Sequence, residues 1–234
     1  MLRGQTAVAI AIAAACALVV PASPAAAEPV IDGEVSIGGY AYGGPSATCG
    51  FAQNPHNDGE SKTLTSTSGR RTARGEARFN ATDGSGEISA HGRYESTASG
   101  IAAFDGESFE RLAYNAEHFV RLANDKRSDC GMRMFSVSLA SVNFVSDRGG
   151  RVHLEWDRSA GGTLEWLRVA SNGDRVYERV RPDARHGDVT FRLRRGVQYS
   201  VSLNFTTRLR ERSVPVGEDL MKTSHVRVVA EYVS

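Results

Sequence analysis

The C-terminal half of the chain alternates hydrophobic and polar residues with a period of two. This alternation is clearest at residues 151–157, 189–194, 197–206 and 226–232. Such a pattern is typical of half-buried strands, in which successive side chains point to opposite faces. Short turn-type connections separate the segments at residues 147–150, 161–162, 171–174 and 195–196. We therefore predict an all-β fold, an antiparallel β-sandwich of the jelly-roll or Greek-key type with about eight to ten strands.

Residues 109–123 fit two periodicities at once. Apolar residues such as Phe109, Leu112 and Ala116 form a stripe with helical spacing. The same segment also alternates as a strand would, with His118 as the exception. We favour a strand, because the turns on both sides are spaced as in a meander, and keep one helix near 109–123 as the alternative.

The N-terminus has the features of an export signal. Arg3 precedes an apolar run from Ala7 to Val20, and Ala25 and Ala27 fit the two small positions of a cleavage site. We predict that residues 1–27 are a cleaved secretory signal peptide and that the mature protein is extracellular. The apolar run is shorter than the roughly 20 residues that a membrane-spanning helix needs, so we expect no membrane span.

The mature chain divides by composition. Residues 28–74 are rich in Gly, Ser, Thr, Asn and Pro and contain few apolar residues, which predicts a loosely ordered N-terminal arm with one strand. Alternation begins after this stretch, so we assign residues 75–234 to the β-sandwich domain.

Two cysteines remain after signal cleavage. Cys16 lies inside the apolar run, which leaves Cys49 and Cys130 in the mature chain. An exported protein meets an oxidising compartment, so we predict a disulfide between them, with two buried free thiols as the alternative. Two distant cysteines do not form a metal site.

One predicted strand gathers titratable residues on a single face. His153, Glu155 and Asp157 alternate with apolar residues, and Glu165 and Trp166 follow on the next strand. Paired carboxylates in a cleft can hydrolyse a glycosidic bond, one as acid and the other as nucleophile or base. The alternative is an ordinary solvated sheet face.

The charges nearly cancel, with 28 Lys plus Arg against 27 Asp plus Glu, which excludes a histone-like protein and makes nucleic acid an unlikely partner. The arginines are nevertheless concentrated in residues 148–212. A face built from them could bind an anionic polymer through planar guanidinium groups. The alternative is general use of arginine at basic surface positions. The candidate residues are Arg179, Arg192, Arg194, Arg208 and Arg210.

Aromatic residues offer a third kind of site. Tyr40 and Tyr42 would share one face of a strand, and Trp166 is a further candidate platform for a sugar ring. The alternative for each is packing in the core or in a turn.

Metal chemistry has little support. No H-E-x-x-H or paired-histidine spacing is present, so we predict no catalytic metal. Calcium remains a possible cofactor at the acidic, glycine-bearing loops 54–60 and 83–87, although Asp-Gly is first of all turn chemistry.

These observations favour a secreted, non-catalytic β-sandwich that acts by binding or by structure at or outside the cell surface. The expected partners are cell-wall or extracellular polysaccharide, or another envelope protein. The alternatives are a polysaccharide-active hydrolase that uses its surface carboxylates and an anionic-polymer-binding protein that uses its arginine-rich half.

Overall fold

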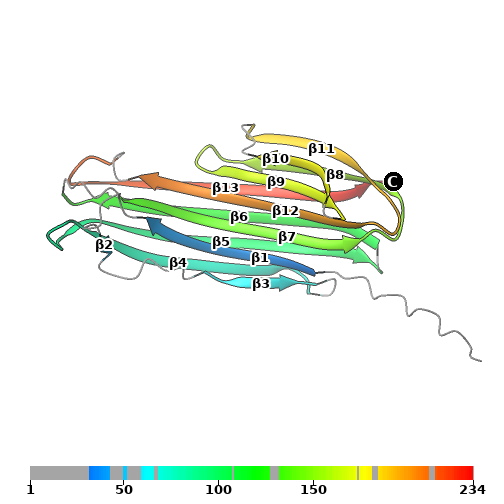
Figure 1. Ribbon diagram of the computed structural model, residues 1–234, viewed down its shortest axis with the longest axis horizontal. Coiled ribbons are helices and arrows are strands. Elements are labelled where there is room, and N and C mark those ends of the chain that lie inside the picture. The colour runs from blue at the N-terminus through cyan, green and yellow to red at the C-terminus, as the bar shows by residue number, and fades with distance from the viewer. Residues whose placement is uncertain are drawn as a thin grey trace, which may run out of the picture.

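A computed structural model of the chain describes residues 32–42, 50–51, 59–65, 68–106, 108–126, 132–172, 174–180, 184–210 and 214–233 (Figure 1). Every regular element in these ranges is a strand. The strands are β1 (Asp32–Tyr42), β2 (Gly50–Phe51), β3 (Ser61–Leu64), β4 (Arg71–Thr82), β5 (Ile88–Asp105), β6 (Ser108–Asn124), β7 (Arg133–Val145), β8 (Gly150–Arg158), β9 (Thr163–Ser171), β10 (Asp174–Val180), β11 (His186–Leu193), β12 (Gln198–Arg210) and β13 (Glu218–Val233).

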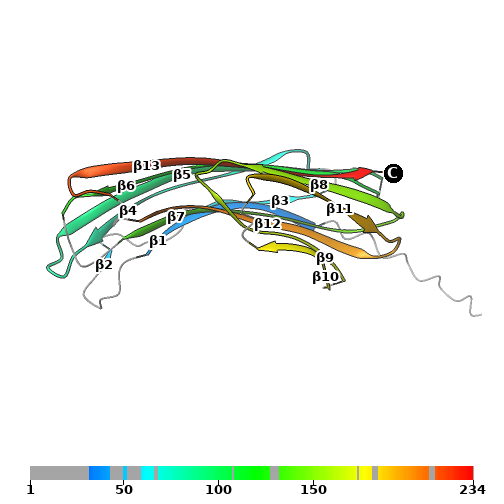
Figure 2. The same cartoon turned by 90° about the horizontal axis from the view of Figure 1, so that it is seen from above.

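The strands form two antiparallel sheets packed face to face, which confirms the predicted β-sandwich. The six-stranded sheet has the order β10-β9-β12-β7-β1-β3, and the seven-stranded sheet has the order β11-β8-β13-β6-β5-β4-β2. Both sheets curve in the same direction, and the six-stranded sheet lies on the concave side (Figure 2). The described residues contain more strands than we expected, because the short strands β2, β3 and β10 extend the sheet edges.

Residues 109–123 lie in a long strand, so the helical alternative is wrong. β6 pairs with β5 along one side and with β13 along the other. Leu112, Ala116 and Val120 are buried, as alternation requires. Pairing on both sides satisfies the backbone of the whole segment and overrides its local helix propensity.

The predicted N-terminal arm contributes an interior strand. β1 lies between β7 and β3, and its Val35 and Ile37 are buried. The predicted signal peptide, residues 1–27, and both cysteines of the predicted disulfide, Cys49 and Cys130, lie outside the described residues. Within the described ranges, no helix is long and apolar enough to cross a membrane.

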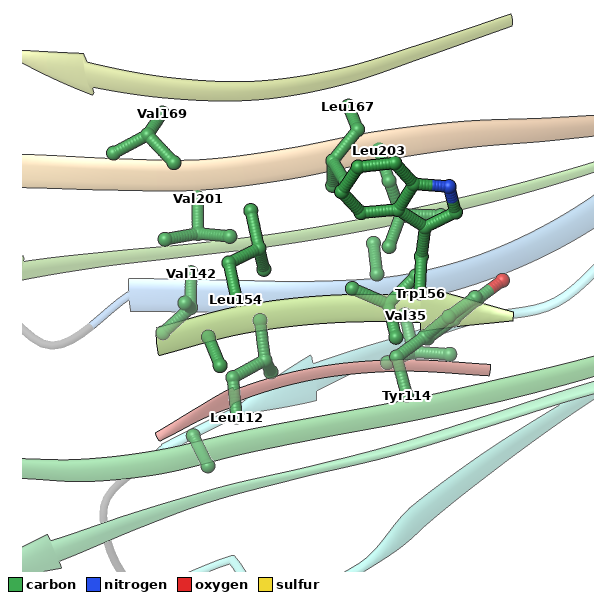
Figure 3. Packing of buried hydrophobic residues seen from close by; sticks show 14 of the residues in the cluster. Val35, Leu112, Tyr114, Val142, Leu154, Trp156, Leu167, Val169, Val201 and Leu203 are labelled. Atoms are coloured by element: carbon green, nitrogen blue, oxygen red, sulfur yellow. The ribbon is translucent and has the colours of Figure 1, made fainter. Parts of the chain in front are cut away.

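The larger hydrophobic core fills the space between the sheets on the side of β8 and β9. Leu154 and Trp156 of β8 pack in one cluster with Leu167 of β9 and Val201 and Leu203 of β12 (Figure 3). A second cluster surrounds Tyr94, Leu122 and Met134.

A layer of buried polar residues also lies between the two sheets. His118 is 2% exposed, and its ring nitrogens lie 3.0 Å from Thr207 Oγ1 and 3.1 Å from Ser138 Oγ. Ser96 and Ser224 are the residues directly opposite His118 in β5 and β13. Ser96 Oγ lies 2.7 Å from Ser136 Oγ of the facing sheet, so polar groups from both sheets bond across the interface.

Candidate functional site

The strongest candidate site lies on the concave outer face of the six-stranded sheet. Tyr40 of β1, Phe135 of β7 and Arg208 of β12 are directly opposite one another in the strand register. The rings of Tyr40 and Phe135 are stacked, with centroids 4.5 Å apart and planes 13° from parallel. The Arg208 guanidinium lies over the Phe135 ring at 5.4 Å. These three residues form an aromatic and cationic row, and Tyr40 remains 47% exposed.

The row continues onto β9. Arg208 forms an ion pair with Glu165, whose side chain is only 12% exposed. The register between β9 and β12 shifts at this point, because Asn204 is opposite Trp166 while Phe205 is opposite Leu164. This bulge places two successive partly buried residues, Glu165 and Trp166, between the fully buried Leu164 and Leu167. The sequence candidates Tyr40, Trp166 and Arg208 therefore lie on one face of one sheet.

Phe135 was not among the sequence candidates, although β7 carries a recognisable pattern. In the run Phe135-Ser136-Val137-Ser138-Leu139, alternation alone places the apolar residues inside and the serines outside. The structure has the reverse arrangement, with both serines fully buried and Leu139 39% exposed. The buried serines pair with the interior polar layer, and the apolar residues of the run are left on the concave face.

A groove of about 330 Å³ adjoins Tyr40 on this face. This volume is within the range of small-ligand sites, which begins at about 300 Å³. Its walls combine the Tyr40 ring and the apolar Val137 and Leu139 with the polar Glu60 and Ser61. The backbone N–H of Arg74 donates to the Glu60 carboxylate at 2.9 Å, and this bond lowers the pKa of Glu60. Apolar, hydroxyl and charged acceptor groups thus meet in one groove.

The predicted arginine candidates whose side chains are described do not lie on one surface. Arg208 and Arg210 lie in β12 of the six-stranded sheet, whereas Arg192 lies in β11 of the seven-stranded sheet and Arg194 follows it. Arg179 lies in β10, and its side chain is outside the described residues, as is that of Tyr42. Neighbouring positions in sequence are separated here because consecutive strands alternate between the two sheets.

The carboxylate row occupies the outer face of the seven-stranded sheet. His153, Glu155 and Asp157 line a pocket of about 490 Å³ with His186 and Asp188 of β11 and Arg227 of β13. Glu155 pairs with Arg227 at 3.4 Å, and His153 Nδ1 lies 4.0 Å from Asp188 Oδ2. The members of these pairs are 36–68% exposed, so the row lies on an open surface.

Glu165 is not a partner of this carboxylate row, contrary to its expected place on a neighbouring strand. The connection from β8 to β9 crosses to the other sheet, and β9 pairs with β12 and β10. Gly161 and Gly162 permit this close crossing. A Cβ atom at Gly162 would lie 2.0 Å from the Phe205 ring, and one at Gly161 would lie 2.3 Å from the Thr223 carbonyl oxygen.

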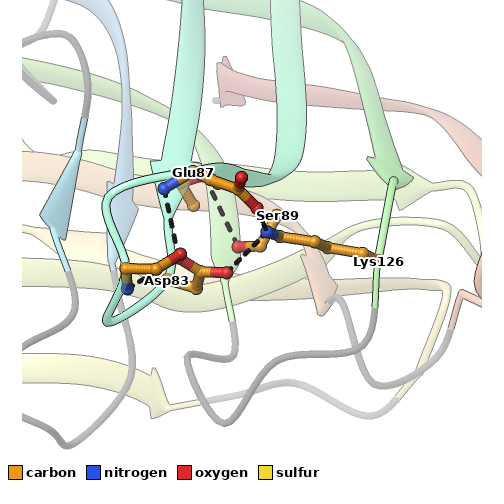
Figure 4. Close-up of polar contacts among 6 residues, drawn as sticks. Asp83, Glu87, Ser89 and Lys126 are labelled. Atoms are coloured by element: carbon orange, nitrogen blue, oxygen red, sulfur yellow. Dashed lines mark hydrogen bonds and ion pairs between the residues drawn. The ribbon is translucent and has the colours of Figure 1, made fainter.

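The acidic loop 83–87 is a turn held by internal bonds (Figure 4). Asp83 accepts from the backbone N–H of Ser85 at 2.9 Å and of Glu87 at 3.1 Å. Lys126 forms ion pairs with Asp83, at 2.7 Å, and with Glu87. The bond from Lys126 is the largest cause that lowers the pKa of Asp83, and the same contacts raise the pKa of Lys126.

A lysine therefore occupies the place that a cation would take in this loop. Most of the other calcium candidate, residues 54–60, lies outside the described residues. Among the described residues, no group of three or more His, Cys, Asp or Glu side chains is arranged to hold a metal ion.

Comparison with known proteins adds little to this picture. No protein family model matches the chain, and no curated protein matches it. Among solved structures, the GH31 α-xylosidase from Xanthomonas citri aligns with 70% of this chain at 8% identity and a TM-score of 0.20. The aligned part spans 31% of that enzyme. A likeness of this size supports neither an activity nor a ligand for this chain.

Proposed function

We propose that the protein is a secreted, non-catalytic β-sandwich that binds a polysaccharide along the concave face of its six-stranded sheet. The observation that carries the proposal is the row of Tyr40, Phe135 and Arg208 beside the groove that contains Glu60. Secretion rests on the predicted signal peptide at residues 1–27, and the disulfide between Cys49 and Cys130 belongs to the same proposal.

The composition of the face suits a sugar polymer. Sugar rings present apolar C–H faces and hydroxyl edges, so they need an aromatic or apolar surface with hydrogen-bonding groups around it. The rings of Tyr40 and Phe135 supply the first kind of surface. Ser141, Ser202 and Asn204, at outward positions of β7 and β12 on the same face, supply the second. Because the sheet is concave, a polysaccharide chain that follows its surface would contact several of these residues at once.

Replacing Tyr40 is expected to weaken the binding of the favoured polysaccharide about five- to tenfold. Covering the exposed half of a tyrosine ring contributes about 1 kcal/mol, and Tyr40→Ala removes that contribution. The measurement is the fraction of purified mature protein that pellets with insoluble cell-wall and polysaccharide preparations, at low and high salt. Stacking on an aromatic ring is expected to resist salt.

Ile88→Ala is the matched control, because Ile88 is also 47% exposed but begins β5 in the other sheet. It is expected to pellet as the wild type does. Equal pelleting of the Tyr40→Ala variant, or no pelleting of the wild type with any polysaccharide, would refute the proposed function.

Hydrolysis of a polysaccharide is the second candidate function, and the observation that favours it is the pocket shared by Glu155, Asp157 and Asp188. If the pocket is catalytic, combining Glu155→Gln with Asp157→Asn abolishes the release of reducing ends from the polysaccharide that the protein binds. The same variant keeps its midpoint of unfolding, because both side chains lie on an open surface. Release that survives both changes excludes these carboxylates as the catalytic pair.

A further inference from the structure

Three arginines stand in one row on the outer face of the seven-stranded sheet. Arg78 of β4 is directly opposite Arg93 of β5, which is directly opposite Arg121 of β6. They come from residues 28–147, in which acidic residues outnumber basic ones. The row is therefore distinct from the arginine-rich part of the sequence, and it lies in the sheet opposite Tyr40.

Like charges directly opposite each other on neighbouring strands destabilise a sheet, so the row needs compensation. Arg93 pairs with Glu95 at 2.6 Å, and Arg121 pairs with Asp219. Arg93 also lies over the Phe119 ring, at 5.8 Å from its centroid. These contacts hold two of the guanidinium groups in place without covering them, since the side chains of Arg93 and Arg121 are 40% and 49% exposed.

Arg78 differs from the other two. It is exposed, and no acidic side chain among the described residues lies within ion-pair distance of it. Its position at one end of the row leaves one positive charge that the protein's described carboxylates do not balance.

The three side chains line one pocket. Its volume is about 450 Å³, and its other lining residues are Asn80, His91 and Gly92. His91 Nδ1 lies 2.8 Å from Asp125 Oδ2, so this acid is already engaged at the margin of the pocket. The remaining side chains of the lining are the three guanidinium groups, which only donate, and the Asn80 amide.

We propose that this pocket binds an oxyanion group, the carboxylate, sulfate or phosphate of an acidic ligand, between Arg78 and Arg121 with Arg93 as its floor. The planar fork of a guanidinium donates two parallel hydrogen bonds to such a group. An oxyanion also relieves the repulsion within the row, so binding and the register of β4, β5 and β6 favour each other. The site is independent of the proposed polysaccharide face.

The test is binding of three probes at constant ionic strength balanced with chloride. Inorganic sulfate and inorganic phosphate represent free or ester oxyanions, and polygalacturonate represents a carboxylate polymer. At least one probe is expected to raise the midpoint of thermal unfolding beyond the effect of chloride, because a ligand of the folded state stabilises it. Which probe acts identifies the source of the oxyanion.

Arg78→Gln and Arg121→Gln are each expected to weaken that binding about tenfold, the usual effect of losing a charge-assisted hydrogen bond. Arg111→Gln is the matched control, because Arg111 lies in the same strand and face as Arg121 and is similarly exposed, at 45%. Tyr40→Ala is expected to leave oxyanion binding unchanged, which separates this site from the polysaccharide face. No response to any probe, or an equal loss in Arg111→Gln, overturns the proposal.

Discussion

Acid is expected to destabilise the fold by several kcal/mol between pH 6.5 and 3 through His118 alone. Burial lowers the pKa of His118 from 6.5 to about 3. Between these values the unfolded chain binds a proton that the folded chain does not, so the free energy of unfolding falls as the pH falls, by up to about 1.4 kcal/mol per pH unit. This contribution is complete above pH 6.5 and is lost toward pH 3.

The surroundings of His118 explain why charging it is costly. The described groups that bond to its ring or lie against it are neutral: the hydroxyls of Thr207 on β12 and Ser138 on β7, and the Phe205 ring at 4.9 Å. No described carboxylate forms an ion pair with it. Thr207 also bonds to Ser224, so the imidazole lies among neutral hydroxyls that can accept its hydrogen bonds but carry no charge to balance an imidazolium.

Urea unfolding at several pH values between 7 and 4 measures this effect against His118→Gln. The variant retains a neutral polar side chain, and its free energy of unfolding is expected to depend less steeply on pH. The slopes of the two proteins should differ by the contribution of one bound proton, up to about 1.4 kcal/mol per pH unit. Carboxylates that titrate in the same range contribute equally to both proteins and cancel. His225→Gln, at an exposed position on the outer face of the neighbouring strand β13, is expected to keep the wild-type slope. Identical slopes for wild type and His118→Gln would contradict the assignment.

Alternation was sufficient to predict the strands that have one buried and one solvated face. β8, β11, β12 and β13 all follow it, because burying one face is what fixes their register. The pattern misleads in β7, where Ser136 and Ser138 are buried and Phe135 is on the outer face. Polar residues can occupy the interior there only because His118 and Ser96, from another strand pair, bond to them. The sequence of β7 alone does not reveal these partners, because they belong to β5 and β6.

The candidate sites depend on which strands are neighbours, and a single sequence does not give that order. Glu165 follows the carboxylate row in the chain but lies in the other sheet, because the connection at Gly161 and Gly162 crosses between sheets. Arg78, Arg93 and Arg121 are far apart in sequence and meet only through the registers of β4, β5 and β6. Tyr40 could be identified from its strand pattern, whereas its partner Phe135 required the pairing of β1 with β7.

The second large effect is expected from the disulfide between Cys49 and Cys130. Both residues lie outside the described ranges, so the prediction rests on the export signal and on the residues that border them. The connection that contains Cys49 begins after Tyr42, and the one that contains Cys130 ends just before Arg133. Tyr42 and Arg133 are directly paired in the six-stranded sheet. The described anchors of both connections therefore lie at the same end of the sandwich, and only a few residues separate each anchor from its cysteine in the sequence.

A disulfide between Cys49 and Cys130 closes a loop of about 80 residues. Closing such a loop stabilises the folded state by about 4 to 5 kcal/mol in the chain-entropy model. Cys49→Ser, Cys130→Ser and the double variant are each expected to lose the same amount in urea unfolding, because either change removes the same bond and the effects of coupled residues do not add. The mass of denatured, unreduced mature protein gives an independent readout. It should take up no alkylating agent before reduction and two equivalents after it. Uptake of two equivalents before reduction, or losses that add in the double variant, would show that the thiols are free and that the fold is stable without a covalent bond between these connections.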